Sequence, residues 1–171
     1  MHLLENEHYE QDVNVVIDML LDKNYNKRKI LDLHGGRNYQ VLSHQKDQHF
    51  FHMKIQYDEV VRLPDSFPEK YKKYVKASNT YITTVEWHLQ DNVKKVGSIT
   101  MEISGMPLVI HAYLQLKNCS GGCERRVEIE IQYKLPFIGK YISQIFSEFI
   151  QQSLTEEYEF NRLFLENNSL Q

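Results

Sequence analysis

The sequence predicts an α+β fold in which a curved antiparallel sheet of about six or seven strands carries one long C-terminal helix over its concave face. Three observations lead to this fold. Strand-like runs between residues 39 and 135 alternate strictly between apolar and polar side chains, the last quarter of the chain is apolar at helical spacing, and two short helical patterns follow the first strand. Strict alternation indicates one buried and one solvated face, as in an antiparallel sheet covered on one side only.

The N-terminal part begins with a strand. Residues 2–10 alternate weakly and are interpreted as strand, and a helix over residues 13–21 follows. Asp12 is a good N-cap for this helix, because a short acidic side chain accepts hydrogen bonds from the N–H groups of the first turn. The residues that share the apolar face of the helix are Val13, Val16, Ile17 and Leu20.

A second short helix is expected directly after the first. Asn24 or Asn26 can start it, and it continues through His34. The Gly35-Gly36 pair ends it, because glycine readily adopts the left-handed conformation that closes helices.

Six strand-like runs then follow, separated by turn residues. They are Tyr39–Gln45, Phe50–Val60, Thr80–Gln90, Val93–Ser104, Leu108–Leu116 and Glu124–Leu135. Two prolines interrupt the pattern between residues 63 and 76. Since strongly twisted sheets of this size curl, we expect a concave apolar face.

The last element is predicted to be a helix over about residues 137–167. Its apolar residues recur every three or four positions, no proline follows Pro136, and Asn167 and Asn168 can end it. A helix of about 30 residues is about 45 Å long. No other element is long enough to cover the sheet, and a space between such a helix and a curved sheet is a common place for a ligand.

Composition limits the classes of function. The chain has 171 residues without repeats or linkers, so we expect a single domain over residues 1–171. A net charge of −3 argues against a nucleic-acid partner. The start of the chain lacks a basic segment followed by an apolar run, and no window approaches about 18 uninterrupted apolar residues, so we expect a cytoplasmic protein.

Several short motifs resemble one known family. They are Leu63-Pro64 with Ser66-Phe67 before a basic stretch, a strand ending in Glu86-Trp87, the Gly97–Pro107 segment, and Pro136–Gly139 at the start of the last helix. Their order, over about residues 3–166, resembles the START-like helix-grip superfamily (SRPBCC) and, within it, a bacterial family described only as a domain of unknown function. The resemblance implies a hydrophobic cavity between sheet and long helix. Superfamily members bind lipids, sterols, polyketides or plant hormones, some are cyclases or ring-hydroxylase subunits, and some assist chaperones.

The expected cavity lining is apolar and aromatic. It consists of Phe51, Met53, Tyr57, Tyr81, Trp87, Ile99, Met101, Ile131, Tyr133, Ile142, Phe146 and Phe149. These side chains favour a hydrophobic ligand, lipid or isoprenoid-like, whose polar head tyrosine hydroxyls could orient. The alternative for each residue is ordinary core packing. Movement of the loop at residues 64–75, or of the helix start at Gly139, would open the cavity.

No catalytic set is expected inside the cavity. The candidate acids and bases lie by alternation on the solvated face: Glu86, His88, Glu102, His111, Glu128 and Glu130. Phosphate-binding loops, nucleophile elbows and cysteine-histidine signatures are absent from the sequence. A cyclase or dehydratase that uses the same cavity is one alternative, and a protein-interaction module that uses the solvated sheet face is another.

Histidines, cysteines and one basic segment are the candidates for metal and membrane contacts. His44, His49 and His52 could converge across the hairpin of residues 39–60, but no metal or other cofactor is expected. Cys119 and Cys123 flank a Ser-Gly-Gly turn and are interpreted as reduced thiols, with a strained disulfide or half of a metal site as alternatives. The basic, tyrosine-bearing segment 69–76 could touch an anionic membrane transiently.

Overall fold

The computed structural model describes residues 2–60, 69, 78–91, 93–106, 108–133 and 139–168, and for residues 133, 139–148 and 168 it describes the backbone alone. The elements in chain order are β1 (His2–Tyr9), α1 (Val13–Leu21), α2 (Lys23–Arg28), the π-helix η1 (Lys29–Leu33), β2 (Arg37–Lys46), β3 (Phe50–Val60), β4 (Ser78–His88), β5 (Lys94–Ile103), β6 (Leu108–Cys119), β7 (Gly122–Tyr133) and α4 (Gly139–Asn168). This order agrees with the predicted one.

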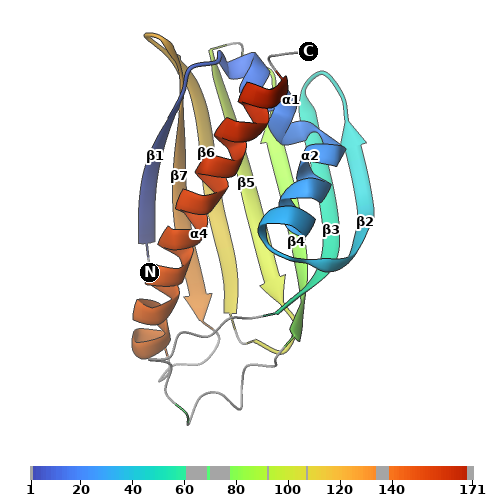
Figure 1. The fold of residues 1–171 in the computed structure, drawn as a ribbon, viewed down its shortest axis with the longest axis vertical. Coiled ribbons are helices and arrows are strands. Elements are labelled where there is room, and N and C mark those ends of the chain that lie inside the picture. Colours follow the sequence, from blue (N-terminus) through green and yellow to red (C-terminus); the bar gives the residue numbers. More distant parts are fainter. Residues whose placement is uncertain are drawn as a thin grey trace.

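The strands form one antiparallel sheet of seven strands in the order β1-β7-β6-β5-β4-β3-β2. Each strand from β2 to β7 pairs with its sequence neighbour, whereas β1 pairs with β7 from the other end of the chain. The helices lie on one face of the sheet (Figure 1). Helix α4 crosses this face diagonally in front of β5–β7, and α1 and α2 lie on the same face next to α4. The predicted α+β architecture, with the long helix over the sheet, is confirmed.

Helix α1 begins where its cap predicts. The Asp12 carboxylate accepts hydrogen bonds from the backbone N–H groups of Asn14 and Val15, at 2.7 and 3.4 Å. Such a cap satisfies donors that have no partner within the helix.

The predicted start of the second helix is wrong. It begins at Lys23, and the N-cap is Asp22, whose carboxylate accepts from the Tyr25 N–H at 2.7 Å. Asn26, one of the two predicted starts, lies inside the helix and donates its side-chain amide to the carbonyls of Leu20 and Asp22. The helix therefore begins before both predicted starts, directly after its aspartate cap.

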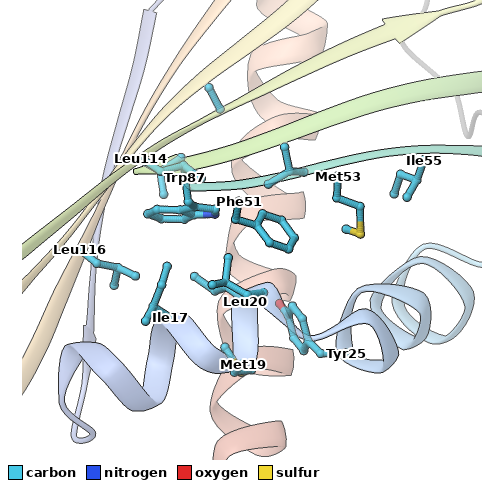
Figure 2. Packing of buried hydrophobic residues seen from close by; sticks show 14 of the residues in the cluster. Ile17, Met19, Leu20, Tyr25, Phe51, Met53, Ile55, Trp87, Leu114 and Leu116 are labelled. Carbon is cyan, nitrogen blue, oxygen red and sulfur yellow. The ribbon is translucent and has the colours of Figure 1, made fainter. Parts of the chain in front are cut away.

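A tightly packed core lies between α1 and the sheet. Phe51, Met53 and Trp87 are at most 1% exposed, and they point toward α1, where Ile17 and Leu20 meet them (Figure 2). The Trp87 indole lies over Gly97 on the neighbouring strand, where a Cβ atom would come within 2.6 Å of it. Glycine at this position therefore leaves room for the largest buried side chain of the core.

The outer face of the sheet is polar, as the alternation predicts. The six candidate acids and bases of the sequence are partly or fully exposed there. His52 bridges two of the strands, with Nε2 2.9 Å from Ser43 Oγ and Nδ1 3.2 Å from Glu86 Oε1. These three side chains follow the order of a Ser–His–acid triad, but they stand on the face opposite the helices.

The hypothesis of a histidine metal site is wrong for the described residues. His44 packs its ring against Phe51 on the concave face, whereas His52 faces outward. His44 of β2 pairs with Met53 of β3, and His52 pairs with Gln45, so the two histidines occupy neighbouring register positions, whose side chains point to opposite faces of the sheet. The described part of the chain holds no group of three His, Cys, Asp or Glu residues suited to a metal ion.

The two cysteines also lie on opposite faces of the hairpin between β6 and β7. Cys123 is buried and pairs with Asn118, whereas Cys119 is exposed and lies 3.7 Å from the His8 ring. Both are free thiols. Neighbouring positions of a strand point to opposite faces, which keeps the two sulfur atoms apart.

Four predictions fall on residues that the structure does not describe. They concern the motif of Leu63-Pro64 with Ser66-Phe67, the opening loop at residues 64–75 and the basic segment 69–76, both apart from Glu69, and the motif at residues 136–138. Within the described ranges, no helix combines the length and hydropathy needed to span a membrane.

Candidate functional site

A cavity of about 180 Å³ lies between the concave face of the sheet and α4. Its wall is largely apolar. The apolar lining comes from β5 (Ile99, Met101, Ile103), β6 (Ile110, Ala112, Leu114), β7 (Val127, Ile129) and α4 (Phe149, Ile150, Leu154), with Met106 from a turn. Inward-facing positions of three neighbouring strands and one helix stripe therefore converge on this space.

Five of the twelve expected cavity residues lie on this wall: Tyr57, Tyr81, Ile99, Met101 and Phe149. The side chains of Tyr133, Ile142 and Phe146 lie outside the described part of the structure. Ile131 is buried without lining the cavity, and Phe51, Met53 and Trp87 belong to the core beneath α1.

The concave face is thus divided into two parts. Beneath α1 the apolar side chains are packed, and beneath α4 they leave space. Alternation assigns a residue to a face of the sheet, but it does not say which helix covers that residue.

Two tyrosines form one side of the cavity. The rings of Tyr57 and Tyr81, which are paired across β3 and β4, stack with their centroids 5.2 Å apart and their planes 6° from parallel. Burial raises the pKa of both hydroxyls well above the ordinary value. Both phenols are therefore neutral at physiological pH, and a neutral phenol can donate a hydrogen bond.

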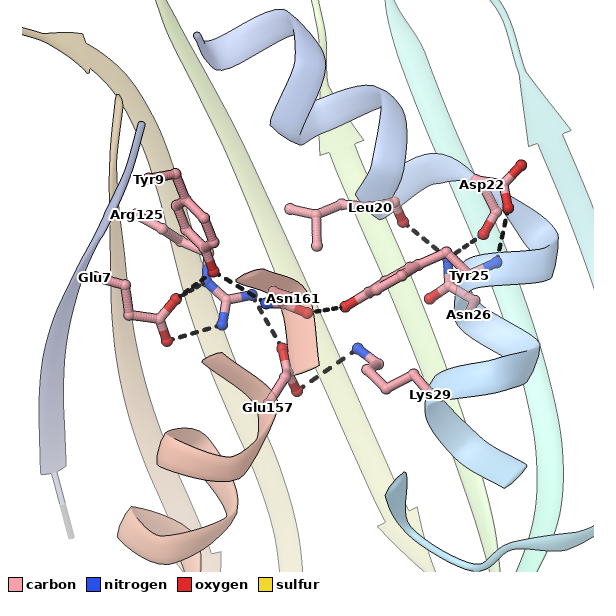
Figure 3. A network of polar contacts seen from close by, with 10 residues as sticks. All are labelled: Glu7, Tyr9, Leu20, Asp22, Tyr25, Asn26, Lys29, Arg125, Glu157 and Asn161. Carbon is pink, nitrogen blue, oxygen red and sulfur yellow. Dashed lines mark hydrogen bonds and ion pairs between the residues drawn. The ribbon is translucent and has the colours of Figure 1, made fainter. Parts of the chain in front are cut away.

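The other side of the cavity is polar and was not predicted from the sequence. Arg125 of β7 lines it together with Glu157 of α4 and His34 at the end of η1. The Arg125 guanidinium donates from Nε and Nη2 to the two carboxylate oxygens of Glu7, at 2.6 and 2.9 Å, and from Nη1 to Glu157 Oε1 at 3.0 Å (Figure 3). Lys29 Nζ lies 3.6 Å from the other oxygen of Glu157. Two cations and two anions therefore meet at the edge of an apolar space.

Further hydrogen bonds extend this cluster. The Tyr9 hydroxyl donates to Glu7 at 2.8 Å, the Asn161 amide donates to the Tyr9 oxygen at 3.0 Å, and the Tyr25 hydroxyl donates to the Asn161 carbonyl. We call the seven residues Glu7, Tyr9, Tyr25, Lys29, Arg125, Glu157 and Asn161 the polar network. It joins both strands at one edge of the sheet to α2, η1 and α4 (Figure 3). Buried hydrogen bonds and ion pairs of this kind fix the relative position of the elements that they join.

The charges of the polar network stabilise one another. Burial alone would raise the pKa of Glu157, but Lys29 and Arg125 outweigh burial and lower the pKa to about 2. Burial would lower the pKa of Arg125, but the surrounding acidic groups raise it instead. Burial and the nearby Lys29 lower the pKa of His34. At neutral pH the polar side of the cavity therefore carries an ionised Glu157, a charged Arg125 and a neutral His34 imidazole.

A signal for part of this network was present in the sequence. Arg125 occupies an alternate position of β7 with Val127, Ile129 and Ile131, so its side chain lies on the apolar face of the strand. Glu7 likewise shares a face with the buried Tyr9. A charged residue at a buried position needs a buried partner, and two such residues of opposite sign indicate an ion pair.

Comparison with known proteins gives one family match. The model of a family described as "Protein of unknown function (DUF2505)" matches residues 6–165. Among curated proteins, none matches the chain.

Solved structures show the same fold at low identity. TTHA0849 from Thermus thermophilus superposes with a TM-score of 0.68 at 8% identity, over 99% of both chains. A conserved protein from Geobacillus kaustophilus gives 0.59 at 11% identity, over 97% of this chain and 94% of that one. The structure of Ara h 8.0201 gives 0.57 at 10% identity, over 98% of both chains. These likenesses confirm the predicted START-like helix-grip fold.

Proposed function

Since the chain belongs to DUF2505, a family of proteins of unknown function, we propose a function from the site itself: the protein binds a hydrophobic small molecule non-covalently in the cavity beneath α4. The observation that carries the proposal is an apolar cavity of about 180 Å³ with polar groups on one side. Ligand sites commonly combine an apolar wall with a few placed polar groups. The START-like resemblance supports the same function, because superfamily members bind hydrophobic molecules.

The cavity volume limits the size of the enclosed group. A cavity of roughly 150 Å³ is enough to bind benzene, whereas sites for drug-sized ligands reach about 300–1,000 Å³. The described space therefore suits one ring or a short alkyl chain. A longer lipid or isoprenoid ligand would need α4 to shift away from the sheet. Binding would be driven by apolar burial, at about 25 cal/mol for each Å² removed from water.

A cavity-filling substitution tests this proposal. Ala112 lies on the cavity wall, paired with Ile99 and Ile129. In Ala112→Phe the added ring occupies the space, so binding should be lost while the protein remains folded. Tyr113→Phe is the matched control, because Tyr113 is 53% exposed on the outer face.

The readout is native mass spectrometry of the purified protein, followed by thermal shift and calorimetry with hydrophobic molecules of increasing size. We expect the natural protein and the control to bind, and Ala112→Phe to bind at least tenfold more weakly. Absence of any bound molecule, with no response to the whole panel, contradicts the proposal. Equal binding by a folded Ala112→Phe protein would place the ligand elsewhere.

A cyclase- or dehydratase-type enzyme is the second candidate, favoured by titratable groups on the cavity wall. His34 is neutral at physiological pH and suits a general base, whereas Glu157 with a pKa of about 2 is too weakly basic to hold a proton. The two candidates differ in what happens to the bound molecule. Recovery of an identified ligand at unchanged mass after long incubation supports a carrier, and conversion that is lost in His34→Gln supports an enzyme.

A further inference from the structure

We propose that the polar side of the cavity selects ligands with a neutral hydroxyl or carbonyl head and rejects ligands with a carboxylate head. The inference rests on the proposed function, since it concerns the same cavity. It follows from the way in which Arg125 and Glu157 are paired.

The arginine resembles a carboxylate-binding residue, but its charge is already compensated. Glu7 takes two of its N–H groups and Glu157 takes a third. Lys29, the second cation of the polar network, lies against Glu157 as well. Two cations face two carboxylates, so the network carries no net charge.

Other charged groups on the described wall do not favour an anion. Besides Glu157, the described lining holds the carboxylate of Glu59, and burial beside Lys29 keeps His34 neutral. Among the described lining residues, Arg125 is the one permanent cation. Against this described part of the wall, a carboxylate head would therefore lose its water, meet a cation that is already paired and face acidic side chains.

A hydroxyl head fits the remaining hydrogen-bonding capacity. Arginine has five N–H donors, and the three bonds to Glu7 and Glu157 leave two. The ionised Glu157 carboxylate has more acceptor positions than its bonds to Arg125 and Lys29 occupy. A donor and an acceptor that lie side by side can both be used by one hydroxyl, which accepts from Arg125 and donates to Glu157. A carbonyl uses the donor alone.

The experiment compares three ligands of equal chain length: 1-octanol, octanoate and 1-chlorooctane. Isothermal titration calorimetry at pH 7 gives the affinity of each for the natural protein. We expect octanol to bind at least tenfold more tightly than octanoate. Chlorooctane, which has the chain without a hydrogen-bonding head, reports burial of the chain alone.

Two substitutions change the charge of the network in opposite directions. Glu157→Gln gives the site one net positive charge, so octanoate should gain at least tenfold relative to octanol. Lys29→Met gives one net negative charge, so octanoate should lose further. Glu159→Gln is the matched control, because Glu159 is exposed on the same helix, and its octanol-to-octanoate ratio should equal that of the natural protein.

The outcomes separate the two proposals. If none of the three ligands binds while other molecules of the hydrophobic panel do, the selectivity is wrong and the binding function stands; if nothing in the panel binds, both proposals fail. If octanoate binds as tightly as octanol, or if the ratio is unchanged in Glu157→Gln, the selectivity is wrong while the binding function stands. Circular dichroism shows whether each variant is folded, and should one variant not fold, the direction of change in the other decides.

Discussion

Removing the Arg125 guanidinium should destabilise the protein strongly. In Arg125→Met, Glu7 loses two short charge-assisted bonds while its side chain remains only 6% exposed. Breaking a buried ion pair from one side costs about 3–5 kcal/mol, because the other charge is left without compensation. Glu157 suffers less, since Lys29 stays 3.6 Å away. In a chain of this length 1 kcal/mol corresponds to roughly 2–4 °C, so the melting temperature should fall by about 6–20 °C.

A second substitution should restore much of this loss. Adding Glu7→Met to Arg125→Met removes the uncompensated carboxylate and fills its place with an apolar side chain. Replacing both partners of a buried pair is often neutral or stabilising. Arg126→Met is the control, because this neighbouring side chain is half exposed on the outer face and should change the stability by less than about 0.5 kcal/mol.

Urea unfolding measures these differences, and Trp87 is a suitable probe because it is the single tryptophan of the chain and is 1% exposed. The natural protein, the two single variants and the double variant form a double-mutant cycle for the pair. A loss below about 1 kcal/mol in Arg125→Met would show that water reaches Glu7 and that the pair is not truly buried. A double variant no more stable than Arg125→Met would show that the arginine acts through its packing rather than its charge.

Three further predictions concern separate parts of the molecule. Glu157 has a pKa near 2 in the folded protein against an ordinary 4.5, so its contribution, on the order of 3 kcal/mol, should be complete above about pH 4.5 and lost as pH falls toward 2; acid unfolding of Glu157→Gln should lack this dependence. Cys119 is exposed, whereas Cys123 is buried with its pKa raised by burial to about 11, so a thiol reagent should modify one cysteine in the native protein and two after unfolding. Gly97→Ala should cost about 1–3 kcal/mol in urea unfolding, since the added methyl group would overlap both the Trp87 indole and the Glu86 carbonyl oxygen, and an unchanged midpoint would show that the indole and the strand can both move aside.

The fold followed from the sequence because its signals are local. Alternation over β3 to β7 reports which face each residue occupies, and the structure places Phe51, Tyr81 and Val127 on the inner face as expected. Asp12 caps α1 through a carboxylate that reaches only the next turn. These features depend on residues a few positions apart, and spacing alone shows them.

The site was harder to predict because its polar partners are far apart in the chain. Glu7 and Arg125 are separated by 118 positions, and Glu157 lies 32 positions beyond Arg125. Periodicity can show that Arg125 faces inward, but only the pairing of β1 with β7 shows which carboxylate receives it. Likewise, which part of the inner face lies beneath α1 and which beneath α4 depends on where the helices pack. The sequence alone therefore could not assign Trp87 to the core and Ile99 to the cavity wall.

The pairing of β1 with β7 has a consequence for how the molecule folds. The sheet from β2 to β7 can grow by pairing each strand with the next in sequence, and the longest connection to be closed is residues 61–77 between β3 and β4. The edge formed by β1 instead closes a loop of more than a hundred residues, for which the chain entropy costs about 4 kcal/mol. Contacts of such long range are made late and slow the overall rate. During synthesis on a ribosome, β1 therefore cannot pair until β7 has been made, and Glu7 remains hydrated until it forms its ion pair with Arg125.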